Sequence, residues 1–211
     1  MNKTKQKILN AALNLYNQSG VSNVSIRQIA LEAKISHSNL IYHYPNHEDL
    51  ILGLHEILLS RALEINKEVE RTSISLIELH NSTKKGFSVV FDFAFLFNDL
   101  QYICNSYPRI KELIVSIEKI RSAMYNNVIN QLISQKWMRA EEFHHEYSQL
   151  INLIKIFSDH WIVSSSIYDD LTKQEKLDKY SYLLMTYFYP YLTPMGKEEF
   201  NKIQITRAKK S

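Results

Sequence analysis

The feature that most constrains the fold is the recurrence of apolar residues at helical spacing along the chain. The first such segment begins near Thr4 and can end at Gly20. Its apolar residues are Ile8, Ala11, Ala12, Leu15 and Tyr16, which follow the i, i+3, i+4, i+7, i+8 pattern of one helix face. The 211 residues include only 4 Gly and 4 Pro, too few for the many turns of a sandwich or barrel. The sequence therefore predicts an all-α fold.

Two short helices joined by a tight turn follow this first helix. Ser25 and Gln28 fit a capping box at the start of a helix over residues 26 to about 33. Ser36 can cap another over residues 37 to about 44. About three residues separate the two, which is the spacing of a helix-turn-helix, whose second helix can enter a major groove of DNA.

The outward face of the second short helix has side chains suited to nucleic acid. The sequence HSNLIYHY buries Leu40 and leaves short donors, acceptors and polar-tipped rings outside. These outward residues are His37, Ser38, Asn39, Tyr42 and His43. Residues 1–47 also carry five basic residues and one acidic residue, while the remainder has 20 basic and 21 acidic. A basic N-terminal part of this kind is typical of a DNA contact.

Residues from about Ile8 to Leu50 resemble the DNA-binding head of TetR-family transcriptional regulators. The residues that carry the resemblance are Ala12, Tyr16, Gly20, Ser25, Ile29, Ala30, Ala33, Ile35, Ser36, Leu40, His43, Tyr44 and residues 48–50. The resemblance implies a sequence-specific regulator of transcription, most often a repressor released by a small molecule. It also implies a homodimer that binds a near-palindromic operator in double-stranded DNA.

The resemblance also implies which residues meet DNA. By position these are Ser25, Arg27, His37, Ser38, Asn39, Tyr42, His43 and His47. Ser25 corresponds to a phosphate contact, and Arg27 to a position where some members read a base. Residues 37–39 correspond to the base-reading part of the recognition helix, and Tyr42 and His43 to phosphate contacts.

Four residues depart from the family pattern. Lys34 replaces the usual turn glycine, which predicts a left-handed lysine. Ile41 and His47 replace a tyrosine and a lysine that commonly meet phosphates, and Ser38 replaces a small residue, often glycine. Lys34, Ile41 and His47 keep open a second interpretation, in which the chain is a helical small-molecule-binding or interaction protein without productive DNA binding.

The rest of the chain shows only helical patterns. Asn46 can cap the first of these helices. The predicted segments are residues 47–70, 76–103, 108 to about 135, 142–167 and 173–189, with a short helix near 197–203. We expect a DNA-binding domain over residues 1–47 and a helical ligand-binding and dimerisation domain over 48–211. This second part also looks like a C-terminal domain type found in some TetR regulators.

The stretch FSVVFDFAFLFNDLQYI is the most aromatic part of the chain, and two interpretations of it stay open. Its phenylalanines fit either a plain core or the wall of an apolar ligand cavity. If they line a cavity, the effector is an apolar small molecule. The candidate pocket residues are Phe91, Asp92, Phe95, Asn98, His160 and Tyr168, with Asp99 as a further polar group.

The last two long segments, 142–167 and 173–189, are apolar around much of their circumference, so something must cover them. In the family, these two helices of each subunit form a four-helix dimer interface. A dimer is also what a helix-turn-helix needs to span two half-sites about 34 Å apart. We therefore expect a homodimer.

Enzyme motifs find no support in the sequence. Residues 141–146 contain the Glu-x-x-His spacing of di-iron bundles, but the second copy that such a site needs is absent from the sequence outside them. The sequence contains no glycine-rich phosphate loop and no Gly-x-Ser-x-Gly. We expect no enzyme, no metal and no cofactor. A membrane span needs about 18–20 consecutive apolar residues, which the sequence lacks, so we expect a cytoplasmic protein without a membrane partner.

Overall fold

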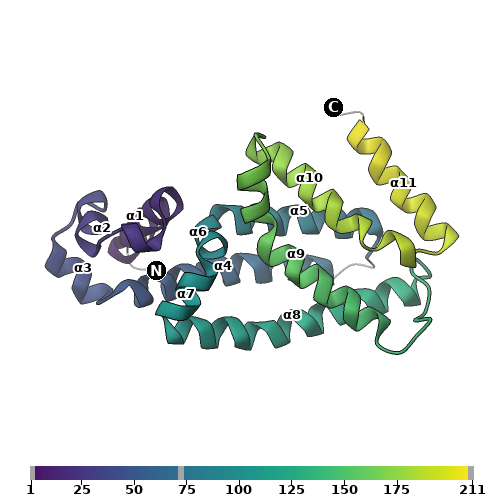
Figure 1. Ribbon diagram of the computed structural model, residues 1–211, viewed down its shortest axis with the longest axis horizontal. Helices are drawn as coiled ribbons and strands as arrows, with labels where there is room; N and C mark the ends of the chain where they lie inside the picture. Colours follow the sequence, from purple (N-terminus) through teal and green to yellow (C-terminus); the bar gives the residue numbers. More distant parts are fainter. Residues whose placement is uncertain (1–2, 71–73, 209–211) are drawn as a thin grey trace. The chain divides into compact units, whose positions relative to one another are not determined.

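The computed structural model describes residues 3–70 and 74–208, and these residues are almost entirely helical (Figure 1). The N-terminal elements are α1 (Lys3–Ser19), η1 (Val21–Asn23), α2 (Ile26–Glu32), α3 (His37–His43) and α4 (His47–Glu70). The middle elements are α5 (Leu76–Asp92), α6 (Ala94–Asn98), α7 (Leu100–Ser106) and α8 (Pro108–Ser134). The last elements are α9 (Glu146–Tyr168), α10 (Lys173–Thr186), η2 (Tyr189–Tyr191) and α11 (Pro194–Ala208). The predicted all-α fold is confirmed.

Local capping explains why the predicted starts of α2, α3 and α4 are correct. Ser25 and Gln28 form the complete capping box, with the Ser25 amide 2.7 Å from Oε1 of Gln28. The hydroxyl of Ser36 accepts from the amide of Asn39 at 3.2 Å. The side chain of Asn46 accepts from the amide of Asp49 at 2.9 Å. Each cap lies within three residues of its partner, so it can be read from the sequence.

The single helix predicted over residues 76–103 is wrong, because the chain breaks it twice. Phe93 leaves helical geometry with φ −114° and ψ 35°, and Asp99 does so with φ −105° and ψ 16°. The result is three helices, α5, α6 and α7. Phe93 is fully buried at the first break, where the side chain of Asn17 from α1 binds both sides of the interruption.

The predicted start of the ninth helix at residue 142 is also wrong. The helix begins at Glu146, because the carboxylate of Glu146 is held by the guanidinium of Arg139 at 2.7 and 2.8 Å and accepts from the amide of Glu142 at 2.8 Å. These bonds reverse the chain before the helix can start. The hydrogen-bonded guanidinium holds the pKa of Glu146 at about 2, well below its usual range.

At the C-terminal end, two further predictions need correction. The helix predicted over residues 173–189 ends at Thr186 and is followed by η2. The short helix predicted near 197–203 is longer and is α11.

The described chain divides into two compact units. The first contains the residues up to Arg61 together with Val90–Ser116, and the second contains Ala62–Val89 and the residues from Ile117 onward. The domain boundary near residue 47 stays a prediction.

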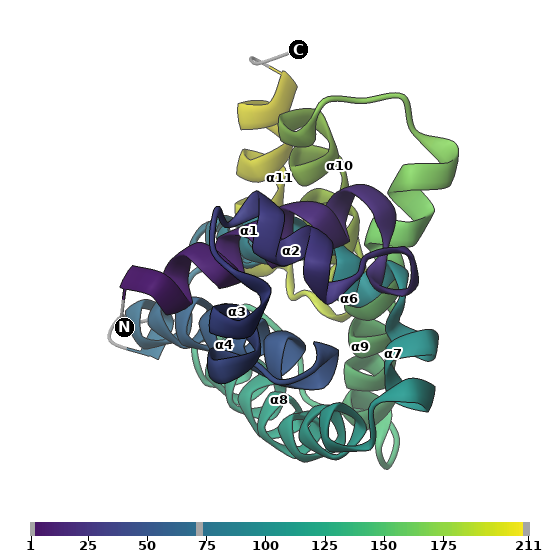
Figure 2. The same ribbon diagram turned by 90° about the vertical axis from the view of Figure 1, so that its left-hand side faces the viewer.

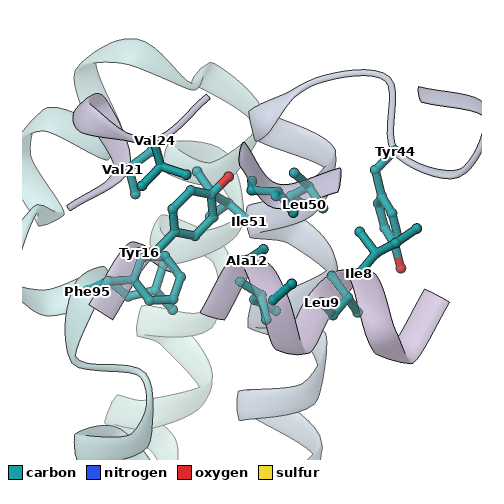
Figure 3. Close-up of a cluster of buried hydrophobic side chains, with 14 of the residues drawn as sticks. Ile8, Leu9, Ala12, Tyr16, Val21, Val24, Tyr44, Leu50, Ile51 and Phe95 are labelled. Carbon is teal, nitrogen blue, oxygen red and sulfur yellow. The ribbon is translucent and has the colours of Figure 1, made fainter. Parts of the chain in front are cut away.

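The core of the first unit joins residues that are far apart in the sequence. Figure 3 shows side chains of α1, η1 and α4 packed with Phe95 of α6. The buried residues labelled there are Ile8, Leu9, Ala12, Tyr16, Val21, Val24, Tyr44, Leu50, Ile51 and Phe95. The ring of Tyr16 lies 5.2 Å from that of Phe95 between centroids. The helices near the N-terminus therefore share one core with residues of the middle of the chain.

The core of the second unit is built around aromatic side chains of α5, α9 and α10. The ring of Phe87 stacks on that of Trp161, with 4.8 Å between the ring centroids. The ring of Tyr180 also contacts Trp161, with 5.3 Å between centroids. Lys84 of α5 forms an ion pair with Asp178 of α10. Among the described residues, no helix has the length and apolar character needed to cross a membrane.

Candidate DNA-binding surface

The two short helices α2 and α3 are held at a fixed angle by the turn between them. Lys34 adopts the left-handed conformation with φ 56°, as its position in the turn predicts. The amide of Lys34 donates to the carbonyl of Leu31, and that of Ile35 to the carbonyl of Ala30, both at 3.0 Å. α2 packs against both α1 and α3, as Figure 2 shows. Local hydrogen bonds therefore define the angle of α3, although a lysine in this conformation is strained.

The inner face of the helix pair is anchored and its outer face is open. Ile29 of α2 and Leu40 of α3 are fully buried, and Tyr44 follows them into the core. This packing turns most of the predicted DNA-contacting residues outward. The exposed ones are Ser25, Arg27, His37, Ser38, Asn39 and Tyr42, and His43 is half-buried. The outer face of α3 therefore offers hydroxyl, amide and ring nitrogen groups to a partner.

His47 is placed differently from the other predicted DNA contacts. Its Nδ1 shares a hydrogen bond of 2.6 Å with the hydroxyl of Tyr16, and the ring is half-buried. Burial lowers the pKa of His47, which favours the neutral imidazole near neutral pH. A neutral ring attracts a phosphate less than the lysine common at this position in the resemblance, so a phosphate contact by His47 stays a prediction.

The charges on α1, α2, α3 and the turn between α2 and α3 favour an anionic partner, because five residues there are basic and one, Glu32, is acidic. The basic residues Lys3, Lys5, Lys7, Arg27 and Lys34 are all exposed. Exposed cations on one small unit are what a phosphate backbone attracts.

The acidic residues at the start of α4, Glu48 and Asp49, are paired with an arginine of the same unit. Arg109 of α8 donates from its guanidinium to Asp49 at 2.8 Å, and its amide donates to Glu48 at 2.9 Å. This pairing reduces the repulsion that two free carboxylates would exert on DNA. Arg109 could not be predicted as a neighbour of these acids, because the contact spans about sixty residues and no local pattern marks it.

The six candidate pocket residues fall in both units. Phe95 lies in the core of the first unit against Tyr16, and Asp92 forms an ion pair with Arg61 at 3.6 Å. Phe91 is half-buried and Asn98 is exposed. In the second unit, His160 and Tyr168 are exposed. The packing of Phe95 agrees with the core interpretation for that residue, and the set as a whole stays a prediction.

Comparison with known sequences gives two family matches. A model described as "Bacterial regulatory proteins, tetR family" matches residues 8–54, and one described as "Bacterial transcriptional repressor" matches residues 56–200. A curated relative, the probable HTH-type transcriptional regulator YttP of Bacillus subtilis (strain 168), is 32% identical over 89 residues. That match covers 42% of this chain and 41% of the relative, so the chain matches less than half of the relative's length.

Solved structures share the whole fold. A TetR-family transcriptional regulator from Marinobacter aquaeolei VT8 has a TM-score of 0.86 at 22% identity, covering 99% of this chain and 98% of that one. A TetR transcription regulator from Haloarcula marismortui ATCC 43049 has a TM-score of 0.73 at 17% identity, covering 92% and 100%. At these identities the similarity is one of fold.

Proposed function

The chain belongs to the TetR family of bacterial transcriptional regulators, and we propose that it is a repressor that binds a near-palindromic operator as a homodimer and is released by a small molecule. The observation that carries the DNA-binding part is the outer face of α3, where His37, Ser38 and Asn39 are exposed on a helix anchored by Leu40. Amide and imidazole groups pair with base edges, and the hydroxyl of a serine meets either bases or phosphates.

The proposed homodimer is supported by apolar side chains on the outside of the second unit. Leu153, Ile156 and Ile167 of α9 and Leu183 of α10 are exposed in the single chain. The three residues of α9 are separated by 3 and 11 positions, which places them on one face of the helix. A stripe of this kind is covered when two subunits pair, which brings two recognition helices to one duplex.

The proposed release by a small molecule follows from linked equilibria. An effector that binds better to the non-binding state of the protein lowers operator affinity by the ratio of its two affinities. We propose an apolar effector, since ligand pockets are lined mostly by apolar side chains.

An alternative is a helical small-molecule-binding or interaction protein that does not bind DNA productively. The hydrogen bond between His47 and Tyr16 favours it, because it ties up one of the groups expected to meet phosphate. The left-handed Lys34 also favours it, since a strained turn weakens the hold on α3.

Selection of duplexes from genomic fragments by the purified full-length protein distinguishes the two functions. We expect one enriched near-palindromic motif, and affinity for it that falls as salt rises, since each neutralised phosphate releases counterions. Asn39→Ala should weaken binding to that motif, whereas the matched control Asn201→Ala, an exposed asparagine of α11, should not. The absence of any salt-sensitive binding would leave the alternative function.

A further inference from the structure

One side chain of α1 binds both sides of the break between α5 and α6. The side-chain amide of Asn17 donates to the carbonyl of Asp92 at 2.9 Å, and its oxygen accepts from the amide of Phe95 at 3.0 Å. A helix end leaves carbonyls without partners, and a helix start leaves amides without partners. Asn17 satisfies one group of each kind, so it stabilises the break at Phe93.

A second side chain fastens the residues that follow α1. Asp99 lies between α6 and α7, where an aspartate usually caps the following helix. Its side chain makes no such cap, and instead its carboxylate accepts from the amide of Val21 at 2.9 Å. Gly20 permits this approach, because a Cβ there would lie 2.9 Å from Oδ2 of Asp99 and its φ is 76°.

These bonds act directly before the DNA-facing residues. Val21 begins η1, and Ser25, four residues later, is the N-cap of α2. Val21 and Val24 are buried in the core that also contains Phe95, so little freedom remains between Asp99 and the start of α2. The position of Ser25 and Arg27 therefore depends on Asp99, which lies 78 residues further along the chain than Val21.

We propose that Asn17 and Asp99 are positioning residues for DNA recognition. They hold the end of α1 on α6 and the first residue of η1, Val21, on the segment between α6 and α7, so that Ser25 and Arg27 meet the duplex in register with α3. The DNA-binding unit is then formed by two separate segments of the sequence, the N-terminal helices and residues 92–99. The effect of Asn17 and Asp99 on DNA recognition rests on the proposed function. Their role in fixing the start of α2 is independent of that function.

The test compares Asp99→Ala, Asp99→Asn and the control Asn105→Ala, at an exposed asparagine of α7, in the full-length chain. Asp99→Ala removes the acceptor for Val21 and should weaken binding to the selected motif about tenfold while changing affinity for random duplex less than about twofold. Asp99→Asn keeps an acceptor oxygen and should recover most of that loss. An equal loss on both duplexes, or no recovery with asparagine, would overturn the positioning role.

Hydrogen exchange of the DNA-free protein separates this inference from the proposed function. Amides of residues 25–28 should exchange faster in Asp99→Ala than in Asn105→Ala, and unchanged exchange there overturns the inference whatever the DNA result. If wild-type protein binds no duplex, the proposed function fails, while faster exchange still supports the fixing of α2 by Asp99. Asn17→Ala removes a different pair of bonds and provides the same two readouts if Asp99→Ala does not fold.

Discussion

Arg27 and Tyr42 are both exposed on the helix pair, but they differ in what they can recognise. A guanidinium can form two parallel bonds to a guanine, whereas a phenol hydroxyl that meets a phosphate carries no sequence information. Arg27→Ala should therefore weaken binding to the selected motif by about 1–3 kcal/mol more than binding to random duplex. Tyr42→Phe should weaken both by similar amounts. Competition assays at fixed salt measure both, and equal losses for Arg27→Ala would reject its base-reading role.

His55 gives the stability of the protein a predictable dependence on pH. The residue is only 8% exposed, and its Nδ1 has no hydrogen-bond partner within the described part of the chain. Burial lowers the pKa of His55, and it lowers that of His47 as well. Below the ordinary histidine pKa of about 6.5 the unfolded chain therefore binds more protons than the folded one.

The contribution of His55 to stability is thus fully present above about pH 6.5. It is lost as the pH falls from there towards the lower pKa that His55 has in the folded protein. His55→Leu should reduce the decline, because a leucine does not titrate. Denaturant unfolding between pH 8 and pH 5 measures it, with pH 8 as the reference where the imidazole is neutral in both states. Parallel declines in wild type and variant would show that His55 does not contribute.

Among the elements, those stabilised by near neighbours were predictable and those shaped by distant contacts were not. The start of α4 at His47 agrees with the prediction, because Asn46 and the acids at its start act within one turn. The break at Phe93 depends on Asn17, and the late start of α9 depends on Arg139. A periodic apolar pattern continues through both places, so it cannot reveal a partner that the fold brings from elsewhere.

Two glycines in helices provide a matched test of packing at this scale. A Cβ built on Gly86 of α5 meets no atom within 4 Å, whereas one on Gly196 of α11 would lie 2.2 Å from the carbonyl oxygen of Trp137. Gly86→Ala should stabilise the protein by about 0.5–1 kcal/mol, since alanine loses less entropy on folding. Gly196→Ala should destabilise it by about 1–3 kcal/mol, because backbone must move.

Thermal and denaturant unfolding of both variants measure these effects. The identical substitution makes each variant the control for the other. A loss of stability in Gly86→Ala would mean that the space beside α5 is filled in solution, for instance by a second subunit.

For the whole molecule, the candidate site also combines features that local sequence determines with features that distant contacts determine. The polar face of α3 was predictable because it is local, whereas the contacts of Arg109, Asn17 and Asp99 join residues that are 60 to 78 positions apart. The oligomeric state is a property of no single element, and the predicted homodimer depends on what covers α9 and α10. Ile156 is the most direct residue to test, since it is 61% exposed in the single chain.

Ile156→Glu should raise the dimer dissociation constant at least about 100-fold, because a symmetric interface loses two buried isoleucines and gains two charges. Ile120→Glu, at a 53% exposed isoleucine of α8, is the matched control and should leave the dimer intact. Sedimentation equilibrium measures both. A wild-type chain that is monomeric at micromolar concentration would contradict the homodimer, and so would dissociation caused by Ile120→Glu alone.

The same pair of variants connects assembly to recognition. A monomer reaches one half-site and a dimer reaches two, so loss of the dimer removes the second set of base and phosphate contacts without touching α3. Ile156→Glu should therefore bind the selected palindrome no more tightly than an isolated half-site, and its salt dependence should fall to about half, since half as many phosphates are neutralised. If the palindrome is still preferred, α9 does not carry the interface and the two recognition helices are brought together by another surface.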